Sequence, residues 1–326
     1  MRAKLLLLGG LLAVAALIPP TALGSNGGFT PVEPASPNAE GIQHSYWFIS
    51  IFALAIFVLV EGLLVAFALR YRRRRRARFE EGADIHGATK LELMWTAGPV
   101  VVLFVIAAFV FIELPGIKNV PSAGAGTAQL DIRVEGHQFY WEFEYPNGVF
   151  AIDTMRAPAG VPVSLEVTAP DDDVIHSWWI PALGGKIDAI PGRVNTTWFQ
   201  ADEGTYEGQC AELCGLEHAN MLASVEVMPE DEFNAWLEER RADQGAGGTA
   251  LGAEMWAGVC AKCHGPDGEG GIGPRLAGSA TLADADAIEA IVRNGRGEMP
   301  AVGADWTDEQ LDALTTYLQE SPPSGS

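Results

Sequence analysis

Twelve residues near the middle of the second half of the chain carry two thiols, an imidazole and a thioether at fixed spacing: Cys210-Ala-Glu-Leu-Cys214-Gly-Leu-Glu-His218-Ala-Asn-Met221. This set of soft ligands suits copper. Apolar residues alternate with polar ones before and after this loop, at Leu130, Ile132 and Val134, at Val161, Val163, Leu165 and Val167, and at Ala223, Val225 and Val227. About 100 residues of short alternating strands, separated by Gly and Pro, predict an all-β sandwich or barrel.

A second candidate imidazole, His176, lies upstream in Asp173-Val-Ile-His176-Ser-Trp-Trp179. Two thiolates, two imidazoles, a thioether and a backbone carbonyl are too many ligands for one ion, whereas two copper ions bridged by two thiolates would use them all. Three alternatives are a Cys210–Cys214 disulfide, a zinc site and a mononuclear copper site. Zinc would leave Met221 without a role, and mononuclear copper needs only one thiolate.

The other two cysteines lie in Cys260-Ala-Lys-Cys263-His264, the attachment signature of a c-type haem. Helical patterns surround it over residues 250–259 and 281–293, and Thr307-Asp-Glu-Gln310 has the spacing of a capping box that opens a third helix. A thioredoxin-like motif is disfavoured, because a histidine follows and no βαβ pattern surrounds it. The pattern predicts a small all-α domain, in which a covalent haem would complete a core that about 70 residues barely provide.

The N-terminal third predicts a membrane anchor. Residues 1–24 read as a cleavable signal peptide, with a third membrane helix as the alternative. Residues 45–69 and 93–114 are apolar runs of 25 and 22 residues, long enough to span a bilayer. The basic cluster between them, residues 70–78, favours the cytoplasmic side and, between two membrane spans, does not indicate nucleic-acid binding. We expect a multi-pass protein of a bacterial plasma membrane, with everything after residue 114 outside.

Composition shifts predict the domain boundaries. A hairpin segment covers residues 25–120, the β-domain 121–241, a Gly-rich flexible linker 242–249 and the helical domain 250–326. A helix over residues 231–241 should pack against the β-domain. Beyond residue 90 the chain holds 36 acidic and 11 basic residues, so the outer portion is strongly acidic and attracts basic partners.

Several motifs carry a family resemblance. The copper-type loop, His176-Ser-Trp178, Lys186-Ile-Asp-Ala-Ile-Pro-Gly-Arg193 and Gly136-His-Gln-Phe-Tyr-Trp141, together with the hairpin, closely resemble subunit II of haem-copper cytochrome c oxidases over residues 40–240. The resemblance implies a cupredoxin Greek-key barrel that holds a binuclear copper A centre. It implies as side-chain ligands His176, Cys210, Cys214, His218 and Met221, with the backbone carbonyl of Glu212. It further implies that the Glu212 side chain reaches a magnesium ion at the interface with subunit I.

Three more positions suggest a functional role, two of them through the resemblance. Glu92 matches an acidic residue at the mouth of a proton channel; the alternative is an ordinary helix-start carboxylate. Glu61 lies deeper in the first span, and a carboxylate inside a membrane is a functional hypothesis by default. Phe139 occupies the position where the family commonly has Trp, which receives electrons from a docked cytochrome c. The substitution predicts that the usual docking entrance has changed, although simple packing would also explain it.

The helical domain resembles a class I cytochrome c. The resemblance implies thioether bonds at Cys260 and Cys263, His264 as the proximal iron ligand, and Met299 as the sixth ligand, with Met255 as its competitor. In Gly271-Ile-Gly-Pro-Arg-Leu276 the Pro carbonyl would orient the histidine. Ligation by His and Met raises the potential and suits electron transfer rather than oxygen binding.

The two resemblances together imply a function. Electrons would pass from an external donor, such as cytochrome c or a cytochrome bc complex, to haem c, then to copper A, and then to haems in subunit I. Dioxygen would be reduced to water there, coupled to proton translocation. The close alternative is a nitric-oxide reductase with a copper A subunit, and an anchored electron shuttle or copper-delivery protein is a further one. A quinol oxidase is disfavoured because its equivalent subunit lacks the copper ligands.

Overall fold

The structure is a computed structural model that describes residues 30–71, 86–121, 129–246 and 248–325. The predicted signal peptide, residues 1–24, and most of the predicted basic cluster, residues 72–78, lie outside the described residues. The chain divides into two units, one of them Glu40–Ile117 and the other made of the remaining residues. The second unit holds all the candidate metal ligands.

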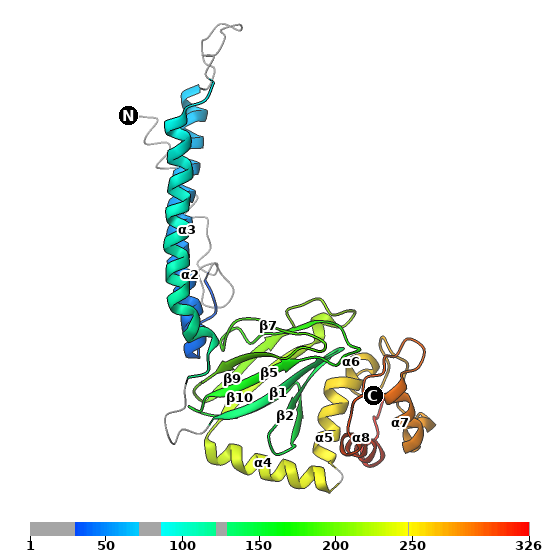
Figure 1. Cartoon of the computed structure of the whole chain (residues 1–326). Coiled ribbons are helices and arrows are strands. Elements are labelled where there is room, and N and C mark those ends of the chain that lie inside the picture. Colours follow the sequence, from blue (N-terminus) through cyan, green and yellow to red (C-terminus); the bar gives the residue numbers. More distant parts are fainter. Residues whose placement is uncertain (1–29, 72–85, 122–128, 247, 326) are drawn as a thin grey trace, which may run out of the picture. The chain divides into compact units, whose positions relative to one another are not determined.

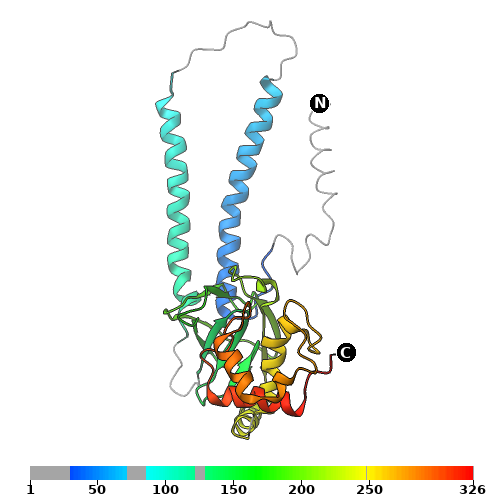
Figure 2. The same ribbon diagram turned by 90° about the vertical axis from the view of Figure 1, so that its right-hand side faces the viewer.

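The first unit consists of two long apolar helices, α2 (Pro37–Tyr71) and α3 (Thr89–Lys118). They contain both predicted spans, and the most apolar stretch of each helix has a mean hydropathy of 2.7, so by length and composition each can cross a membrane. Figure 2 shows them as two separate rods, and the rings of Phe48 and Phe109 stack between them with centroids 3.9 Å apart. The prediction of two membrane-capable helices is confirmed.

Three sheets build the β-domain (Figure 1). The first has the order β3-β2-β1-β5-β8, the second β4-β10-β9 and the third β6-β7. The strand bounds are β1 Leu130–His137, β2 Tyr140–Glu144, β3 Phe150–Ile152, β4 Thr154–Pro158, β5 Val163–Thr168, β6 His176–Trp178, β7 Ile187–Ala189, β8 Asn195–Phe199, β9 Gly204–Gln209 and β10 Leu222–Met228. β1 pairs in parallel with β5, and β4 with β10, which links strands far apart in the sequence.

The alternation of apolar residues places the barrel core. In β1, β5 and β10 the predicted residues point inward, and Ile132, Val134 and Leu165 are almost fully buried. β2 breaks the alternation, because four consecutive residues, Tyr140 to Phe143, are buried. Trp141 and Phe143 face the barrel core, while Tyr140 belongs to a second core shared with the C-terminal helices. β2 is therefore covered on both faces.

The predicted helix after the β-domain is longer than expected. α4 (Glu230–Gly245) extends into residues 242–249, where the sequence predicted a flexible linker. Gly248 adopts a positive φ of 66° just before the next helix, and the Asp243 carboxylate accepts the N–H of Ala250 at 3.2 Å. Residues up to Gly245 are therefore helical, and the hydrogen bond from Ala250 ties the start of α5 to the end of α4. As predicted, α4 packs on the β-domain, with Phe233 buried against Tyr145.

The C-terminal helices are α5 (Thr249–Met255), α6 (Ala261–His264), α7 (Ala285–Asn294) and α8 (Asp308–Glu320), with a π-helical turn at Trp256–Cys260 and a 3-10 turn at Ala280–Ala283. The predicted capping box is present, since the Thr307 side chain and the Gln310 side chain each bond the other's backbone. A core of Leu251, Met255, Trp306 and Leu314 joins these helices to the β-domain.

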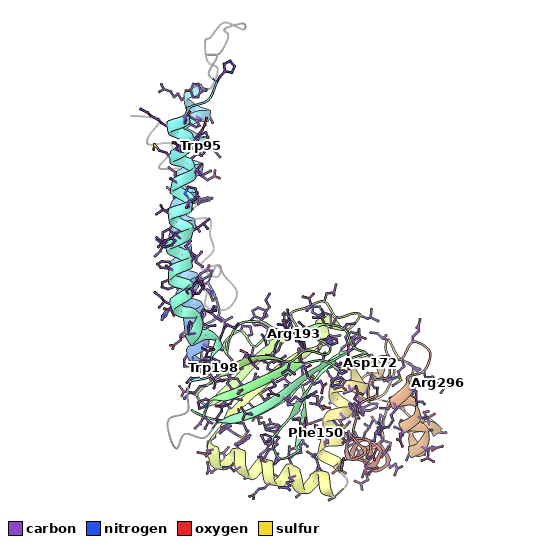
Figure 3. The ribbon with its side chains drawn as sticks, viewed as in Figure 1. Trp95, Phe150, Asp172, Arg193, Trp198 and Arg296 are labelled. Carbon is purple, nitrogen blue, oxygen red and sulfur yellow. The ribbon has the colours of Figure 1, made fainter. Side chains whose placement is uncertain are left out.

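The contact between the two domains runs along β2 and β3. β3, whose Phe150 is labelled in Figure 3, lies against α5, and β4 lies against α4. The backbone N–H of Phe150 bonds Gln244 Oε1 at 3.0 Å, and that of Ile152 bonds Glu254 Oε2 at 3.3 Å. We expected two domains joined by a flexible segment, but they share a buried core. Apolar burial and hydrogen bonds of this kind fix the position of one domain on the other.

Candidate metal centres

The β9–β10 hairpin positions the copper-type loop. The strands pair antiparallel with Leu222 opposite Gln209, so Cys210 and Met221 stand at the two ends of the loop. The N–H of Cys210 bonds the carbonyl of Met221 at 2.9 Å and closes it. Next to it, the N–H of Ala211 bonds Ser177 O at 2.9 Å, which ties the loop to β6. Because β6 begins at His176, this bond brings the distant histidine to the thiols.

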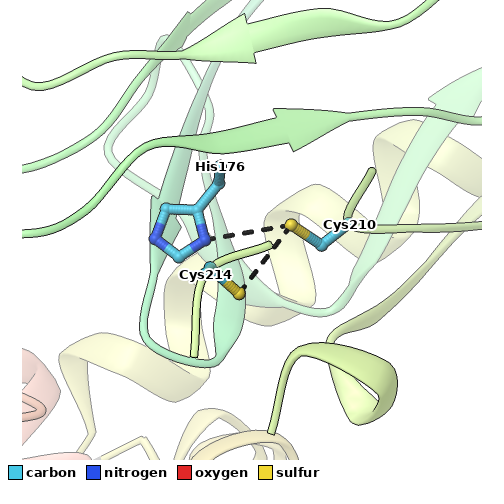
Figure 4. A group of neighbouring side chains, drawn as sticks. All are labelled: His176, Cys210 and Cys214. Atoms are coloured by element: carbon cyan, nitrogen blue, oxygen red, sulfur yellow. Dashed lines mark hydrogen bonds between the residues drawn. The ribbon is translucent and has the colours of Figure 1, made fainter. Parts of the chain in front are cut away.

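Figure 4 shows the resulting cluster of His176, Cys210 and Cys214. Cys210 Sγ lies 3.9 Å from His176 Nδ1 and 4.0 Å from Cys214 Sγ. Cys214 Sγ in turn lies 3.6 Å from His218 Nδ1 and 3.8 Å from Met221 Sδ. All five predicted side-chain ligands therefore gather around one point.

The donor set fits a pair of soft metal ions. A metal–sulfur bond is about 2.3 Å, so sulfurs 4.0 Å apart can both hold the same ion. Both cysteines are free, and this separation is far above the roughly 2.05 Å of a disulfide. The thioether of Met221 is fully buried inside the cluster. Copper would use this sulfur as a ligand, whereas zinc would leave it without a role. The Glu212 carbonyl lies 3.2 Å from Cys210 Sγ, and its role as a ligand stays a prediction.

The electrostatics of the cluster favour one thiolate, the form in which a cysteine binds a metal. The hydrogen bond with Cys214 lowers the pKa of Cys210 to about 3, against the effect of burial. The same interaction raises the pKa of Cys214, so the two thiols share one proton and the pair loses the other readily. Burial lowers the pKa of His176, but its hydrogen bonds to Asp173 and Cys210 outweigh burial and the net shift is upward.

Asp173 is a site residue to which the sequence assigned no role. Its Oδ1 lies 3.2 Å from His176 Nε2, and its Oδ2 accepts the N–H of Gln138 at 3.0 Å. Burial alone would raise the pKa of Asp173, but the hydrogen bond from His176 leads the interactions that lower it. A carboxylate on Nε2 fixes the imidazole so that Nδ1 faces the sulfurs. Its position three residues before the histidine is the only signal in the sequence.

The haem-type motif lies at the end of α6. His264 is 6% exposed, and its Nδ1 lies 2.8 Å from the carbonyl of Pro274, the contact that the resemblance implied. This bond leaves Nε2 available for iron. A Cβ on Gly273 would lie 2.7 Å from the His264 ring, so only glycine allows the loop to approach so closely. Cys260 and Cys263 are free and half-buried, which fits thioether attachment.

Met299 is half-buried in a tight turn, where its N–H and carbonyl both bond the backbone of Arg296. Met255, its competitor as sixth ligand, is fully buried in the shared core and packs there. The roles of the haem ligands stay predictions.

Three other predicted residues have ordinary local structure. Glu212 is exposed, and its magnesium role stays a prediction. Glu92 lies in the first turn of α3, where its Oε1 accepts the N–H of Ala88 at 2.9 Å, as an ordinary helix-start carboxylate does. Glu61 is exposed on α2. The proton-channel role of Glu92 stays a prediction.

Phe139 lies between the two metal-type motifs. A Cβ on Gly215 would lie 2.9 Å from the Phe139 ring, so the ring rests on the copper-type loop. Its carbonyl accepts a hydrogen bond from Lys262 Nζ at 2.9 Å. The neighbouring Gln138 Nε2 donates to Cys214 O at 2.5 Å. A short chain of bonds thus connects the Cys-x-x-Cys segment with a predicted copper ligand.

Comparisons with known proteins agree with this architecture. The chain matches the family model of the cytochrome c oxidase subunit II periplasmic domain over residues 148–228 and that of its transmembrane domain over residues 25–112. Residues 247–318 match the model of subunit III of cbb3-type cytochrome c oxidase. The first two families imply a copper A domain behind a membrane anchor, and the third implies a haem c.

Curated relatives of the chain are named cytochrome c oxidase subunit 2. The chain is 33% identical over 315 residues to cytochrome c oxidase subunit 2 of Alkalihalophilus pseudofirmus, covering 89% of this chain and 90% of the relative. It is 34% identical over 257 residues to the subunit 2 of Cereibacter sphaeroides, covering 66% and 80%. The crystal structure of the periplasmic domain of oxidase subunit II from Bradyrhizobium japonicum is 36% identical, covers 38% of this chain and 98% of its own, and has a TM-score of 0.35. The chain therefore belongs to the cytochrome c oxidase subunit II family, with a cytochrome c domain at its C-terminal end.

Proposed function

We propose that this chain passes electrons from a covalently bound haem c to a binuclear copper A centre and on to the haems of subunit I. Dioxygen would be reduced to water in subunit I, coupled to proton translocation. The observation that carries the proposal is the bond chain from Lys262, beside the haem cysteines, through Phe139 and Gln138 to Cys214. It supports the proposal because it joins the two predicted ligand segments through hydrogen bonds within one folded unit.

Each cofactor would be bound by its own set of residues. The haem would be held by Cys260, Cys263, His264 and Met299, and the copper pair by His176, Cys210, Cys214, His218, Met221 and the carbonyl of Glu212. When bound, the two groups supply one-electron redox chemistry. The protein keeps the thiols and imidazoles oriented, through Asp173 at the copper ligands and Pro274 at the proximal histidine. Magnesium at Glu212 and proton uptake at Glu92 belong to the same proposal.

The interface around Lys262 holds the haem segment against the copper loop. Its ammonium donates to Phe139 O and to Asp153 Oδ2, at 2.9 and 2.6 Å. Asp153 also accepts the N–H of Trp141 at 2.9 Å, so one carboxylate anchors β2 and the haem segment together. The ammonium of the lysine between the two haem cysteines is thus held by two hydrogen bonds.

A fixed interface changes how electrons arrive. A separate cytochrome must find its docking surface by diffusion, whereas a fused domain has a high effective concentration at that surface. The backbone of Phe139, where relatives of this type commonly have Trp, is already occupied by Lys262. We infer that the fused domain has taken over the docking position, and that the external donor reduces haem c instead.

The membrane anchor and the acidic outer portion indicate where the proposed electron relay would lie and which donor it would favour. Assembly with subunit I and other oxidase subunits would place both metal centres on the outer side of a bacterial plasma membrane. The outer portion, with 36 acidic and 11 basic residues beyond residue 90, would favour a basic donor such as a cytochrome c. A cytochrome bc complex is the other donor consistent with the proposal.

The test uses the chain purified with its partner subunits. Freeze-quench electron paramagnetic resonance, taken while an external reductant is added, should show haem c reduced first and a mixed-valence copper signal changing second. In a Cys214→Ser variant haem c should still be reduced, whereas oxygen uptake should stop. Oxygen uptake at the wild-type rate in this variant would refute the proposed order.

The same preparation separates the alternatives. Oxygen uptake without nitric-oxide consumption supports an oxidase, and the reverse supports a nitric-oxide reductase. A chain that purifies without haem-bearing partner subunits under mild detergent would indicate an electron shuttle or copper-delivery protein instead.

A further inference from the structure

The β1–β2 hairpin presents four polar side chains on the face turned away from the barrel core. Glu135 and His137 alternate along β1, and Tyr140 and Glu142 along β2. The strands pair with Glu135 opposite Glu142 and His137 opposite Tyr140. Side chains directly opposite on an antiparallel pair share a face, about 5 Å apart. This face meets the C-terminal helices and is therefore buried, unlike the polar face of an ordinary sandwich strand (Figure 1).

Two carboxylates directly opposite each other on such a face are unfavourable. Glu142 is only 8% exposed, and its Oε2 accepts a hydrogen bond from Gln310 Nε2 of α8 at 2.6 Å. The amide is neutral and does not balance the charge. Arg133 pairs with Glu135 at 3.3 Å, on the more exposed side of the pair. The buried carboxylate of Glu142 therefore needs a positive charge or a proton.

His137 supplies an independent observation. It too is only 8% exposed, and its Nε2 is buried with no hydrogen-bond partner among the described residues. Its ring stacks flat on Tyr140, with centroids 4.6 Å apart and planes within 1°, which fixes its orientation. Burial lowers the pKa of His137 to about 4, so the imidazole is neutral and can act as a ligand. A buried imidazole nitrogen without a partner calls for one.

The side chains of these two glutamates and the histidine lie close together. One ligand atom each from Glu135, His137 and Glu142 lie within 4.8 Å of one another. One imidazole and two carboxylates form an open three-ligand set that suits zinc, with water in the fourth position. We propose that Glu135, His137 and Glu142 bind one divalent cation, with Zn²⁺ the best match, separate from the haem and copper centres.

The proposed site lies on the opposite face of β1 from the copper ligands. Gly136, between the two β1 ligands, points the other way, and a Cβ there would lie 3.1 Å from the Cβ of His176. The cation would lie where the C-terminal helices dock, because its ligand Glu142 is bonded to Gln310. Binding would neutralise the buried carboxylate at the joint and stabilise the docked arrangement of the two domains.

The alternative to a bound cation is a proton on Glu142. Burial, with the neighbouring charge of Glu135, raises the pKa of Glu142 to about 8, so a metal-free Glu142 is largely protonated at neutral pH. A protonated acid could also satisfy this face without a cation, although it would leave the Nε2 atom of His137 unpaired. The experiment must therefore distinguish zinc from a proton.

The test uses the full chain in detergent, loaded with copper and haem and without a polyhistidine tag. Equilibrium dialysis against Zn²⁺ alone at pH 8, read out by elemental analysis, should give one more bound zinc in the wild type than in Glu142→Gln. The Gln keeps the shape of the side chain and can still bond Gln310. Zinc affinity should fall at least about tenfold in Glu142→Gln and in Glu135→Gln, since even the loss of an outer partner costs that much.

Glu144→Gln is the matched control, because Glu144 is on the same strand and face but exposed. It should bind zinc like the wild type. Zinc should also raise the urea midpoint of the wild type and of Glu144→Gln, and leave that of Glu142→Gln unchanged, because only a ligand of the folded state stabilises it. Equal zinc binding by the wild type and Glu142→Gln, or no zinc bound by the wild type, would overturn the proposal and leave Glu142 as a protonated acid.

Discussion

The ion pair of Lys262 and Asp153 offers the sharpest test of the shared interface. The two atoms, Nζ and Oδ2, are 2.6 Å apart, and the side chains are only 14% and 22% exposed. Replacing Lys262 by Met keeps the stem but removes the charge and both hydrogen bonds. Of the hydrogen bonds described above, the Asp153 carboxylate then keeps only the one from the backbone N–H of Trp141.

The size of the effect follows from this burial. A fully buried pair costs roughly 3–5 kcal/mol when one partner is removed, and an exposed pair contributes about 1 kcal/mol or less. Since this pair is mostly but not fully buried, Lys262→Met should cost about 2 kcal/mol. With a urea m-value of roughly 2 kcal/mol/M for a unit of this size, the midpoint should fall by about 1 M.

The assay is urea unfolding of the haem-loaded full chain, followed by haem absorbance, for a double-mutant cycle. Asp153→Asn is the partner change, because Asn tolerates the positive φ of 56° at this position and keeps one oxygen. The double variant should be less destabilised than the sum of the single variants, by about 1 kcal/mol or more. Lys186→Met, at an exposed lysine, controls for the loss of any positive charge and should shift the midpoint little.

Additive effects in the cycle, with a coupling energy below about 0.3 kcal/mol, would contradict this account. The Lys262 ammonium would then be paired with water rather than with the copper domain. The Lys262–Asp153 ion pair would then contribute nothing measurable to holding the haem segment against the copper domain.

Three further predictions concern the same joint and the haem. Tyr140→Phe removes the hydroxyl that bonds Trp306 Nε1 at 2.8 Å, and leaving that buried N–H unpaired should cost about 1–3 kcal/mol in the urea assay. After dialysis to remove loosely bound cations, stability should fall as pH rises toward 8, because the folded pKa of Glu142, about 8, is above its ordinary 4.5 and the folded state holds the proton more tightly. Glu142→Gln should flatten this fall between pH 7.5 and 8.5, where His137, with an ordinary pKa of 6.5 and a folded pKa of about 4, is deprotonated in both states and adds almost no slope; an unchanged slope would point to another group. Met299→Ala should lower the haem potential in a redox titration, and an unchanged potential would reassign the sixth ligand.

The sequence alone determined the features that depend on local spacing. The copper-type loop, the Cys-x-x-Cys-His motif, the capping box at Thr307 and the alternation in β1 each lie within about a dozen residues. Their chemistry follows from covalent spacing and the period of the helix or strand. The same holds for the two apolar helices, whose length and hydropathy identify them without any partner.

The tertiary structure decided what lies together. His176 reaches Cys210 across 34 positions, Lys262 reaches Asp153 across 109, and Gln310 reaches Glu142 across 168. No local period encodes such pairs, because they depend on how the strands and helices pack after the chain has reversed many times. The same packing covered the polar face of β2 and buried Glu142, and it extended α4 through Gly245 into the predicted flexible linker.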